Sequence, residues 1–206
     1  MDRRDLVEGR AQSGGREPAE GELRLVQDFV NTVDRENGVE LLDGPEGLAL
    51  WLDHRGFAHG RVERADVERA RALREALRTI LLANNGGPDP RGAYETLGDV
   101  AREARLAPVF DDPRLEPAAD GIDAALGRVV AAAFTAMLDG RWERLKACPR
   151  YVCGWVFHDR SPANRGTWCS MRVCGNRVKA NAYYRRRAGA PARRAGRPSG
   201  GSARES

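Results

Sequence analysis

Apolar side chains recur at helical spacing through most of the chain. A first helix is predicted over 22–34, where one face collects Leu23, Val26, Phe29, Val30 and Val33. A second is predicted after Asp43, because Pro45 suits a first helical turn and Gly56 suits a stop. Its apolar side consists of Leu48, Trp51 and Leu52. These patterns predict a helical fold with Trp51 in its core.

Two further helices are predicted to form the centre of this fold. The helix over 66–83 ends before Asn84 and carries one apolar face, made of Val67, Ala70, Leu73, Leu77, Ile80 and Leu81. The helix over 121–139 is apolar almost all round after Arg128, which is typical of a central helix. Between them, glycines interrupt a helix predicted over 90–106, and the prolines in 107–118 favour a loop or a short edge hairpin.

Composition divides the chain into four parts. Residues 1–21 and 188–206 are rich in Gly, Ala, Ser, Pro and Arg without apolar periodicity, so both are predicted to be disordered tails. The helical pattern fills 22–140, and a small module follows over 141–187, beginning with a short extended stretch. We expect the fold to be mainly α, with the core of the helical domain separate from that module.

The charge of the chain is segregated along its length. The formal net charge is +4, but residues 141–206 hold 16 Lys and Arg against 3 Asp and Glu, a net +13, which leaves −9 on residues 1–140. This asymmetry points to a polyanion-binding end. No apolar run is long enough to cross a bilayer, and the first twenty residues contain no apolar block like that of a signal peptide. A cytoplasmic location without membrane contact is therefore expected.

Four cysteines follow the spacing C-x4-C-x15-C-x4-C, at Cys148, Cys153, Cys169 and Cys174. In a reducing compartment such pairs favour one structural Zn²⁺ held by four thiolates over disulfide or redox use. The module is expected to be treble-clef-like, or a knuckle plus a helix. Glycine follows the second cysteine of each pair, and both Gly154 and Gly175 are expected to adopt positive φ. His158 is an alternative ligand, whereas His54 and His59 read as capping or solvated side chains.

A basic helix is predicted beyond Cys169, either continuous or beginning at Asn176 as its N-cap. If continuous, its inner side consists of Met171, Cys174, Val178 and Ala182. The opposite stripe, with its neighbours, is the candidate nucleic-acid-binding surface, namely Arg172, Asn176, Arg177, Lys179, Tyr183, Arg186 and Arg187. Arg and Lys neutralise phosphates, and Asn and Arg read base edges. The alternative is a solvated charged face.

The cysteine segment resembles the CGNR zinc finger through Cys174, Gly175, Asn176 and Arg177. The wider pattern agrees at Trp155, Phe157, Asp159, Ser161, Trp168, Cys169, Ser170 and Met171. The run 28–32, with Leu41, Leu42, Leu48, Trp51 and Leu52, resembles the ABATE-type domain that precedes this finger. The resemblance implies a transcription regulator, described as stress-induced, with a DNA-binding finger. The loop 161–167 lacks several arginines common in the family, which would weaken phosphate binding or shift it to Arg177, Lys179 and the tail.

Three classes of function follow from these patterns. The leading hypothesis is a DNA-binding regulator whose helical domain senses a ligand, dimerises or contacts another protein. The second is a zinc-stapled module that binds RNA or an acidic protein surface. No nucleophile motif, phosphate loop or HExxH-type motif supports an enzyme. Asn31 and Thr32 either line a ligand pocket or hydrogen-bond to a neighbouring helix, and a homodimer would strengthen DNA binding.

Overall fold

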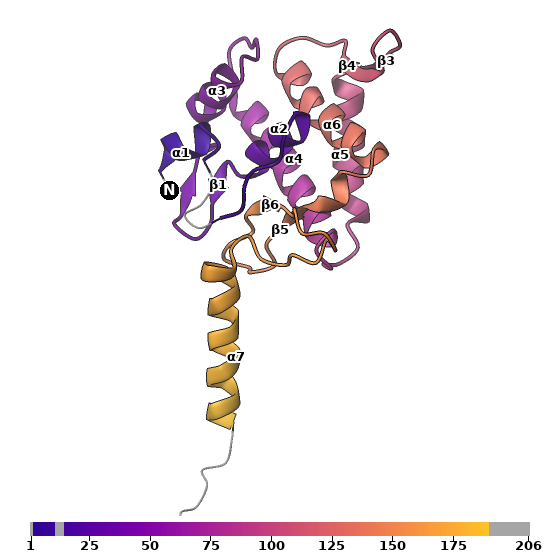
Figure 1. The fold of residues 1–206 in the computed structure, drawn as a ribbon. Coiled ribbons are helices and arrows are strands. Elements are labelled where there is room, and N and C mark those ends of the chain that lie inside the picture. The colour runs from indigo at the N-terminus through magenta and orange to yellow at the C-terminus, as the bar shows by residue number, and fades with distance from the viewer. Residues whose placement is uncertain (1, 11–14, 190–206) are drawn as a thin grey trace, which may run out of the picture.

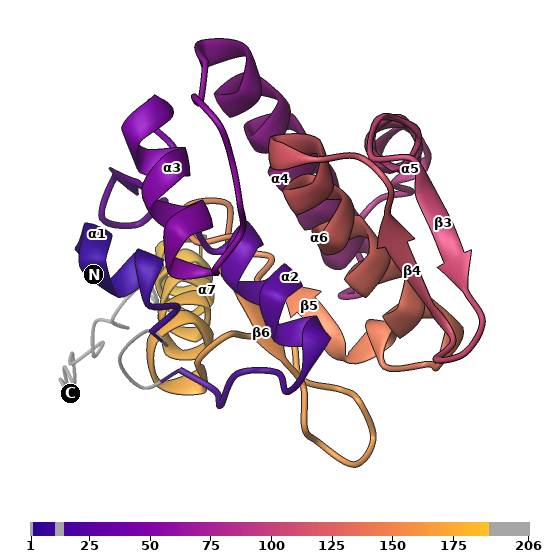
Figure 2. The same ribbon diagram turned by 90° about the horizontal axis from the view of Figure 1, so that it is seen from above.

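The computed structural model describes residues 2–10 and 15–189, and within them the fold is mainly helical. Helices α2 (Glu22–Val30), α4 (Arg64–Ala83), α5 (Arg91–Glu103) and α6 (Gly121–Leu138) pack together, and α3 (Pro45–His54) lies beside α4. Helices α4 and α6 both contact α2 and α5, and in the view of Figure 2 they overlap at the centre of this helical body. Trp51 is fully buried there and meets the Phe29 ring edge-on at 5.2 Å between centroids. Its predicted place in the core is confirmed.

By length and composition helix α6 could cross a membrane, although Asp123 and Arg128 interrupt its apolar residues, so that it contains no uncharged run of that length. It is the one such helix in the described part of the chain, and half of it is buried inside the body. Its start and end lie within a residue of the predicted bounds. A Cβ added at Gly127 would lie 2.4 Å from that of Ala104, so glycine is required where α6 meets the segment after α5.

The first helix is shorter than predicted. α2 ends at Val30, and the chain continues into a hairpin of β1 (Val33–Asp34) and β2 (Val39–Glu40). The Thr32 hydroxyl donates to the Phe29 carbonyl at 2.9 Å, which replaces a further helical bond. The polar pair at 31–32 therefore stops the helix that the apolar spacing extended to 34.

A second hairpin joins α5 to α6. Strands β3 (Leu106–Val109) and β4 (Arg114–Pro117) pair antiparallel, with Leu106 opposite Pro117. This outcome confirms the short-hairpin alternative for 107–118. Helix α5 ends at Glu103 rather than at 106, because Arg105 takes a positive φ of 50° and leads into β3.

The N-terminal segment is ordered wherever it is described, so the predicted disordered tail over 1–21 is wrong for 2–10 and 15–21. Residues Arg3–Val7 form α1, which Asp2 and Asp5 cap reciprocally. Leu6 and Val7 are buried, and Arg3 pairs with Asp43 at the start of the α3 segment. The composition of this segment did not predict the helix, because it contains only two apolar residues that pack on the body. Of the predicted C-terminal tail, 188 and 189 belong to the last helix and 190–206 lie outside the described residues.

The C-terminal module is not separate from the helical body. After a 3₁₀ turn (Trp142–Arg144), β5 (Leu145–Ala147) contacts α4, and β6 (Val156–His158) contacts α2. Buried residues of the module, including Trp155 and Phe157, belong to the same apolar cluster as Phe29 and Trp51. The expectation of two separate cores is therefore wrong.

A π-helical turn (Met171–Gly175), which contains Cys174, leads into α7 (Asn176–Gly189). Figure 1 shows α7 extending away from the body. Its main contacts are with the turn that precedes it.

Candidate metal centre and basic helix

The first two cysteines lie in a tight knuckle between β5 and β6. Cys148 follows β5, and its amide donates to the Trp155 carbonyl at 2.9 Å, extending the strand ladder. The amide of Cys153 donates to the Arg150 carbonyl at 2.8 Å and closes the turn. Gly154 has φ of +59°, as predicted, which lets the chain reverse into β6.

The second pair of cysteines flanks the start of the C-terminal helix. Ser170 caps the π-helical turn by accepting from the Val173 amide at 3.3 Å, so Ser170 rather than Asn176 begins the helix. Asn176 itself has helical angles, which excludes the predicted N-cap role. Gly175 does not adopt positive φ, contrary to expectation. A Cβ there would lie 2.7 Å from the Met171 sulfur, so space rather than backbone angle requires this glycine.

The four cysteines form one cluster. All four Sγ atoms lie within 4.8 Å of one another, and all four residues are buried. The Sγ atoms of Cys153 and Cys169 are 3.6 Å apart, and those of Cys169 and Cys174 are 3.5 Å apart. Tetrahedral bonding at about 2.3 Å requires sulfur separations of about 3.8 Å. The residues fit one structural zinc ion held by four thiolates.

The electrostatics of the cluster favour replacement of its protons by a metal. Thiol donation from Cys153 and Cys169, with backbone amides, lowers the pKa of Cys148 to about 2. The pKa of Cys153 is raised to about 12, because its thiol donates to Cys148. That of Cys169 is also raised, by the same donation and by burial. A bound cation removes the conflict among four sulfurs in one buried space, since it lets all of them be thiolates.

Arg150 and Arg177 connect the cluster to the helical body. The Arg150 guanidinium donates to the Cys174 Sγ at 3.3 Å and pairs with the Glu36 carboxylate at 3.3 Å. Glu36 lies in the β1–β2 turn and also pairs with Arg177 at the start of α7. Because two arginines of the module share one carboxylate of the body, the base of α7 is tied to that turn.

A buried carboxylate organises the loop between the two cysteine pairs. Asp159 is fully buried and accepts from Lys146 at 3.1 Å, from Arg16 at 3.0 Å and from the Gly166 amide at 2.5 Å. Burial alone would raise its pKa, but the hydrogen bonds from Ser161, Lys146 and Gly166 hold that pKa well below its usual range. The resemblance pointed to Asp159 without assigning it a role. Its partners lie too far apart in sequence for spacing to reveal them.

Asn31 fastens the finger to α2. Its side-chain amide donates to the Val156 carbonyl at 2.9 Å, and its carbonyl accepts from the Val156 amide at 2.8 Å. Arg78 of α4 donates to the Gly154 and Val30 carbonyls, the latter at 2.6 Å. Asn31 therefore bonds to a strand of the finger and not to a helix, and Thr32 accepts from Arg74.

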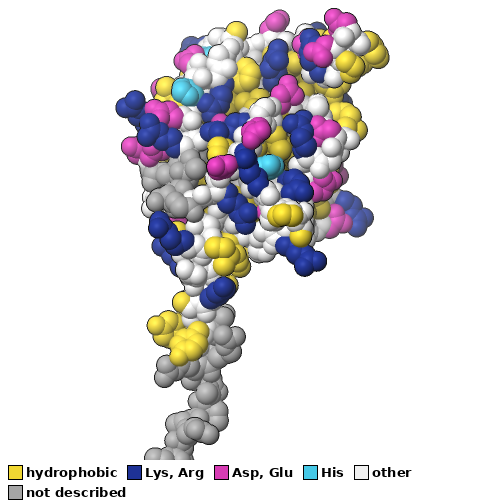
Figure 3. All heavy atoms as spheres, in the orientation of Figure 1, with side chains coloured by type: hydrophobic (Ala, Val, Ile, Leu, Met, Phe, Trp, Pro, Cys, Tyr) yellow, Lys and Arg dark blue, Asp and Glu magenta, His cyan; other side chains and the backbone are white. Residues whose placement is uncertain are grey.

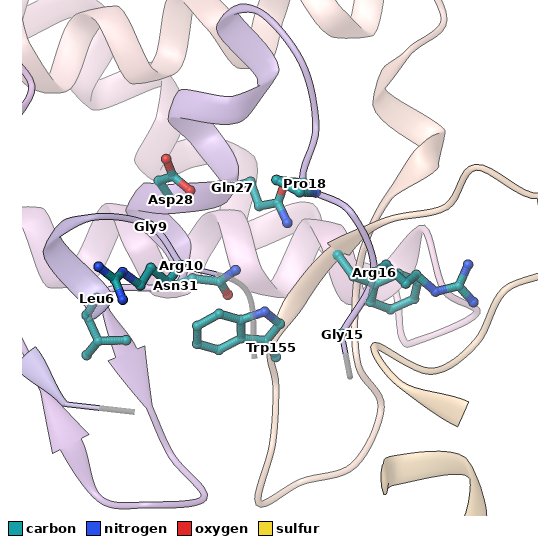
Figure 4. A pocket seen from close by; sticks show the side chains of 11 residues that line it. Leu6, Gly9, Arg10, Gly15, Arg16, Pro18, Gln27, Asp28, Asn31 and Trp155 are labelled. Atoms are coloured by element: carbon teal, nitrogen blue, oxygen red, sulfur yellow. The ribbon is translucent and has the colours of Figure 1, made fainter. Parts of the chain in front are cut away.

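Figure 4 shows Asn31, Gln27 and Trp155 around a pocket between α2 and the finger. Its volume is about 10 Å³, which is room for about one water molecule. Asn31 thus lines a pocket, but one too small for a larger ligand.

The predicted nucleic-acid residues lie on or beside α7. Arg172, Asn176, Arg177 and Lys179 are exposed, and Tyr183 is about half exposed. The side chains of Arg186 and Arg187 lie outside the described residues, as does that of Ala182. On the predicted inner side, Cys174 is buried and Val178 is half-buried, but Met171 is 48% exposed. The wider π-helical turn changes the residue spacing, so Met171 does not share the face of Cys174.

The histidines lie outside the metal cluster. Four cysteines form the one group of metal-ligand geometry in the described residues, so His158 is not among the ligands there. The half-buried His59 hydrogen-bonds through Nε2 to the Asp53 carboxylate at 3.0 Å, near the end of α3. His158 is half-buried in β6, whereas His54 is exposed at the end of α3.

Comparison with family models covers nearly the whole described body. Residues 23–141 match the ABATE family, described as "Putative stress-induced transcription regulator". The chain belongs to this family. Residues 144–187 match the CGNR zinc finger, so an ABATE domain precedes a CGNR finger in the order that the motifs indicated. Neither family is described by an enzymatic activity. Among curated proteins, none matches the chain.

Proposed function

We propose that this ABATE protein is a transcription regulator that binds DNA through α7. The observation that carries the proposal is a basic helix held at its base by the cysteine cluster and projecting from the body (Figure 1). Its 14 residues span about 21 Å and include five Lys and Arg and no Asp or Glu. A helix of this width fits the major groove of B-DNA.

The cations on α7 and in the π-helical turn before it differ in whether a carboxylate already neutralises them. Among the described residues, Arg172 and Lys179 form no ion pair, whereas Arg177 pairs with Glu36. Phosphate contacts release condensed counterions, so unpaired cations contribute most to affinity. We therefore assign the phosphate contacts first to Arg172 and Lys179, with Asn176 placed to read a base edge. Cytoplasmic location, where such a regulator meets DNA, is part of the same proposal.

A second candidate is a module that binds single-stranded RNA or DNA. Exposed aromatic rings favour it, because Tyr151 at the tip of the knuckle is 91% exposed and Tyr184 is 67% exposed. Unpaired bases stack on such rings. The positive charge of α7 also suits an acidic protein partner, but such a partner would not explain the exposed tyrosines.

The test is a salt series of duplex-DNA binding by the zinc-loaded full chain, followed by fluorescence anisotropy. We expect the double variant Arg172→Gln/Lys179→Gln to reduce the log–log salt slope by about 1.8, which is two phosphates at about 0.9 each. The matched control is Arg91→Gln/Arg102→Gln, which removes the same charge from exposed sites on α5. Equal slopes in both variants would remove α7 from the interface. Stronger competition by single strands than by duplex would favour the second candidate.

A further inference from the structure

A second pocket opens at the junction of the helical body and the finger. Its volume is about 400 Å³, within the range of small-molecule sites. Glu20 and Leu23 line it from the α2 side, and its other walls come from the segment around β5 and β6, namely Arg141, Arg144, His158 and Arg160. Figure 3 shows Lys and Arg side chains gathered over this part of the surface. The pocket therefore joins both parts of the chain under an excess of guanidinium groups.

Arg144 is the arginine of this pocket that has no carboxylate partner among the described residues. Its guanidinium is held in place by the Asp159 and Ser161 carbonyls, at 3.1 and 2.9 Å. It forms no ion pair within residues 2–10 and 15–189. The Asp159 carboxylate is already shared by Lys146 and Arg16. A half-buried, oriented and unneutralised guanidinium is suited to bind an oxyanion.

The two neighbouring arginines are neutralised by carboxylates at the rim. Arg141 pairs with Asp139 at 2.5 Å, and Arg160 pairs with Glu17 and Glu20 at 2.9 and 2.8 Å. These carboxylates would repel a long polyanion that approached the rim. They leave room for one small anionic group beside Arg144.

His158 supplies a second, independent sign of a ligand. Its Nδ1 is buried and has no hydrogen-bond partner among the described residues. Burial, with Arg160 and Arg144 nearby, lowers its pKa, so the ring is neutral near pH 7. An unsatisfied buried polar atom is destabilising, so a ligand group or a water molecule that bonds to it is favoured.

We propose that this pocket binds a small molecule through a carboxylate or phosphate group. Arg144 is the principal partner of the oxyanion, Arg141 and Arg160 flank it, and Leu23 meets the apolar part of the ligand. Because Leu23 belongs to the body and Arg144 to the finger, an occupied pocket bridges the two. The proposal does not depend on DNA binding, since the pocket and α7 share no residue.

The test is an NMR titration of the zinc-loaded full chain with inorganic phosphate and, separately, with butyrate, at constant ionic strength and without nucleic acid. Saturable shifts of the Arg144 Nε–H signal are expected for the anion class that the pocket accepts. Arg144→Gln should weaken that anion at least about tenfold, since it removes a charge-assisted hydrogen bond. The control Arg91→Gln removes an equally charged, exposed side chain and should leave the affinity unchanged.

A second variant is expected to raise the anion affinity of the same pocket. Glu20 is 84% exposed at its side chain, so Glu20→Gln should not disturb folding, and it removes one of the two carboxylates that neutralise Arg160. Anion affinity should rise about two- to fivefold, the range of one exposed charge pair. Unsaturable shifts with both anions, or an unchanged affinity in Glu20→Gln, would overturn the proposal even if Arg144→Gln fails to fold.

Discussion

The zinc knuckle and α7 belong to the same finger but stand in opposite relations to the rest of the molecule. The knuckle is enclosed, because β5 contacts α4, β6 contacts α2, and its cysteines are buried. Helix α7 projects from that base (Figure 1), and Asn176, Arg177 and Lys179 in its first turn are exposed. The metal cluster is therefore structurally part of the helical body, whereas the helix is the element that remains available to a partner.

The enclosure depends on polar groups as much as on apolar ones. Asn31 and Arg78 satisfy backbone groups of Val156 and Gly154 from two different helices of the body. No comparable set of side-chain bonds from the body reaches the described part of α7 beyond Arg177. A substitution in the knuckle should therefore lower stability more than a substitution at the base of α7.

The largest effect is expected from Cys174→Ser. Loss of one thiolate removes zinc, and structural zinc contributes on the order of 10 kcal/mol of apparent folding free energy. Because the finger shares its apolar cluster with the body, the denaturation midpoint of the whole chain should fall as well. Metal analysis and guanidinium denaturation followed by tryptophan fluorescence measure both effects. The control is Val152→Ser, at an exposed position of the same knuckle. If the helical body of Cys174→Ser keeps the denaturation midpoint of the parent, the finger and the body are two independent folding units.

Asp159→Asn should be the next most damaging change. It leaves Lys146 buried without its carboxylate, and breaking a buried pair costs about 3–5 kcal/mol. Because the pKa of Asp159 is lowered on folding, its contribution is fully present above the unfolded value of about 3.9 and is lost as the pH falls further. Urea denaturation between pH 2 and 7 should thus show a flatter acid limb in the variant. The exposed pair at Asp99 offers a control, Asp99→Asn, which should retain the acid dependence of the parent.

Asn31→Ala tests the connection between α2 and β6. It leaves the Val156 amide without its partner, and we expect a loss of about 1–3 kcal/mol. Hydrogen exchange reads the effect at one atom, because the Val156 amide should lose protection while amides of α4 keep theirs. Asn181→Ala on exposed α7 should change neither quantity. Unaltered protection at Val156 would mean that the strand is held by apolar packing alone.

Glu36→Gln should have the smallest effect on stability, below about 1 kcal/mol, because its ion pairs with Arg150 and Arg177 are partly exposed. Its effect on DNA should have the opposite sign, since Arg177 loses a competing carboxylate. Affinity for duplex DNA is expected to rise about two- to fivefold. Fluorescence anisotropy compares the variant with Glu46→Gln, a removal of the same charge at the start of α3. A weaker complex would identify Glu36 as a support of the bound helix.

Local signals made the helices and the cysteine cluster predictable. Apolar spacing located α3, α4 and α6, and a repeated C-x4-C pattern identified four ligands that the fold brings within 4.8 Å. The N-terminal helix α1 was not predicted, because its two buried apolar residues, Leu6 and Val7, are too few to produce a helical pattern and are stabilised by packing on distant segments. At Gly175 the residue type was informative, but the reason differed, since the neighbouring Met171 side chain requires the space.

The contacts that join finger and body could not be predicted from spacing. Asn31 and Val156 are 125 positions apart, and Arg16 reaches Asp159 across 143 positions. Asparagine near a helix end has many ordinary uses, so nothing in the sequence distinguishes a side chain that bonds to a remote strand. The pocket beside Arg144 was missed for the same reason, since its walls come from both ends of the chain.

The bonds between Asn31 and Val156 also decide how copies of this chain can assemble. A two-stranded ribbon exposes unpaired backbone groups along its outer edge, where another strand can add. On β6 the amide and carbonyl of Val156 are occupied by Asn31, and Gln27 donates to the same carbonyl at 3.2 Å. A second copy of this chain therefore cannot add a strand at the Val156 position of the β6 edge.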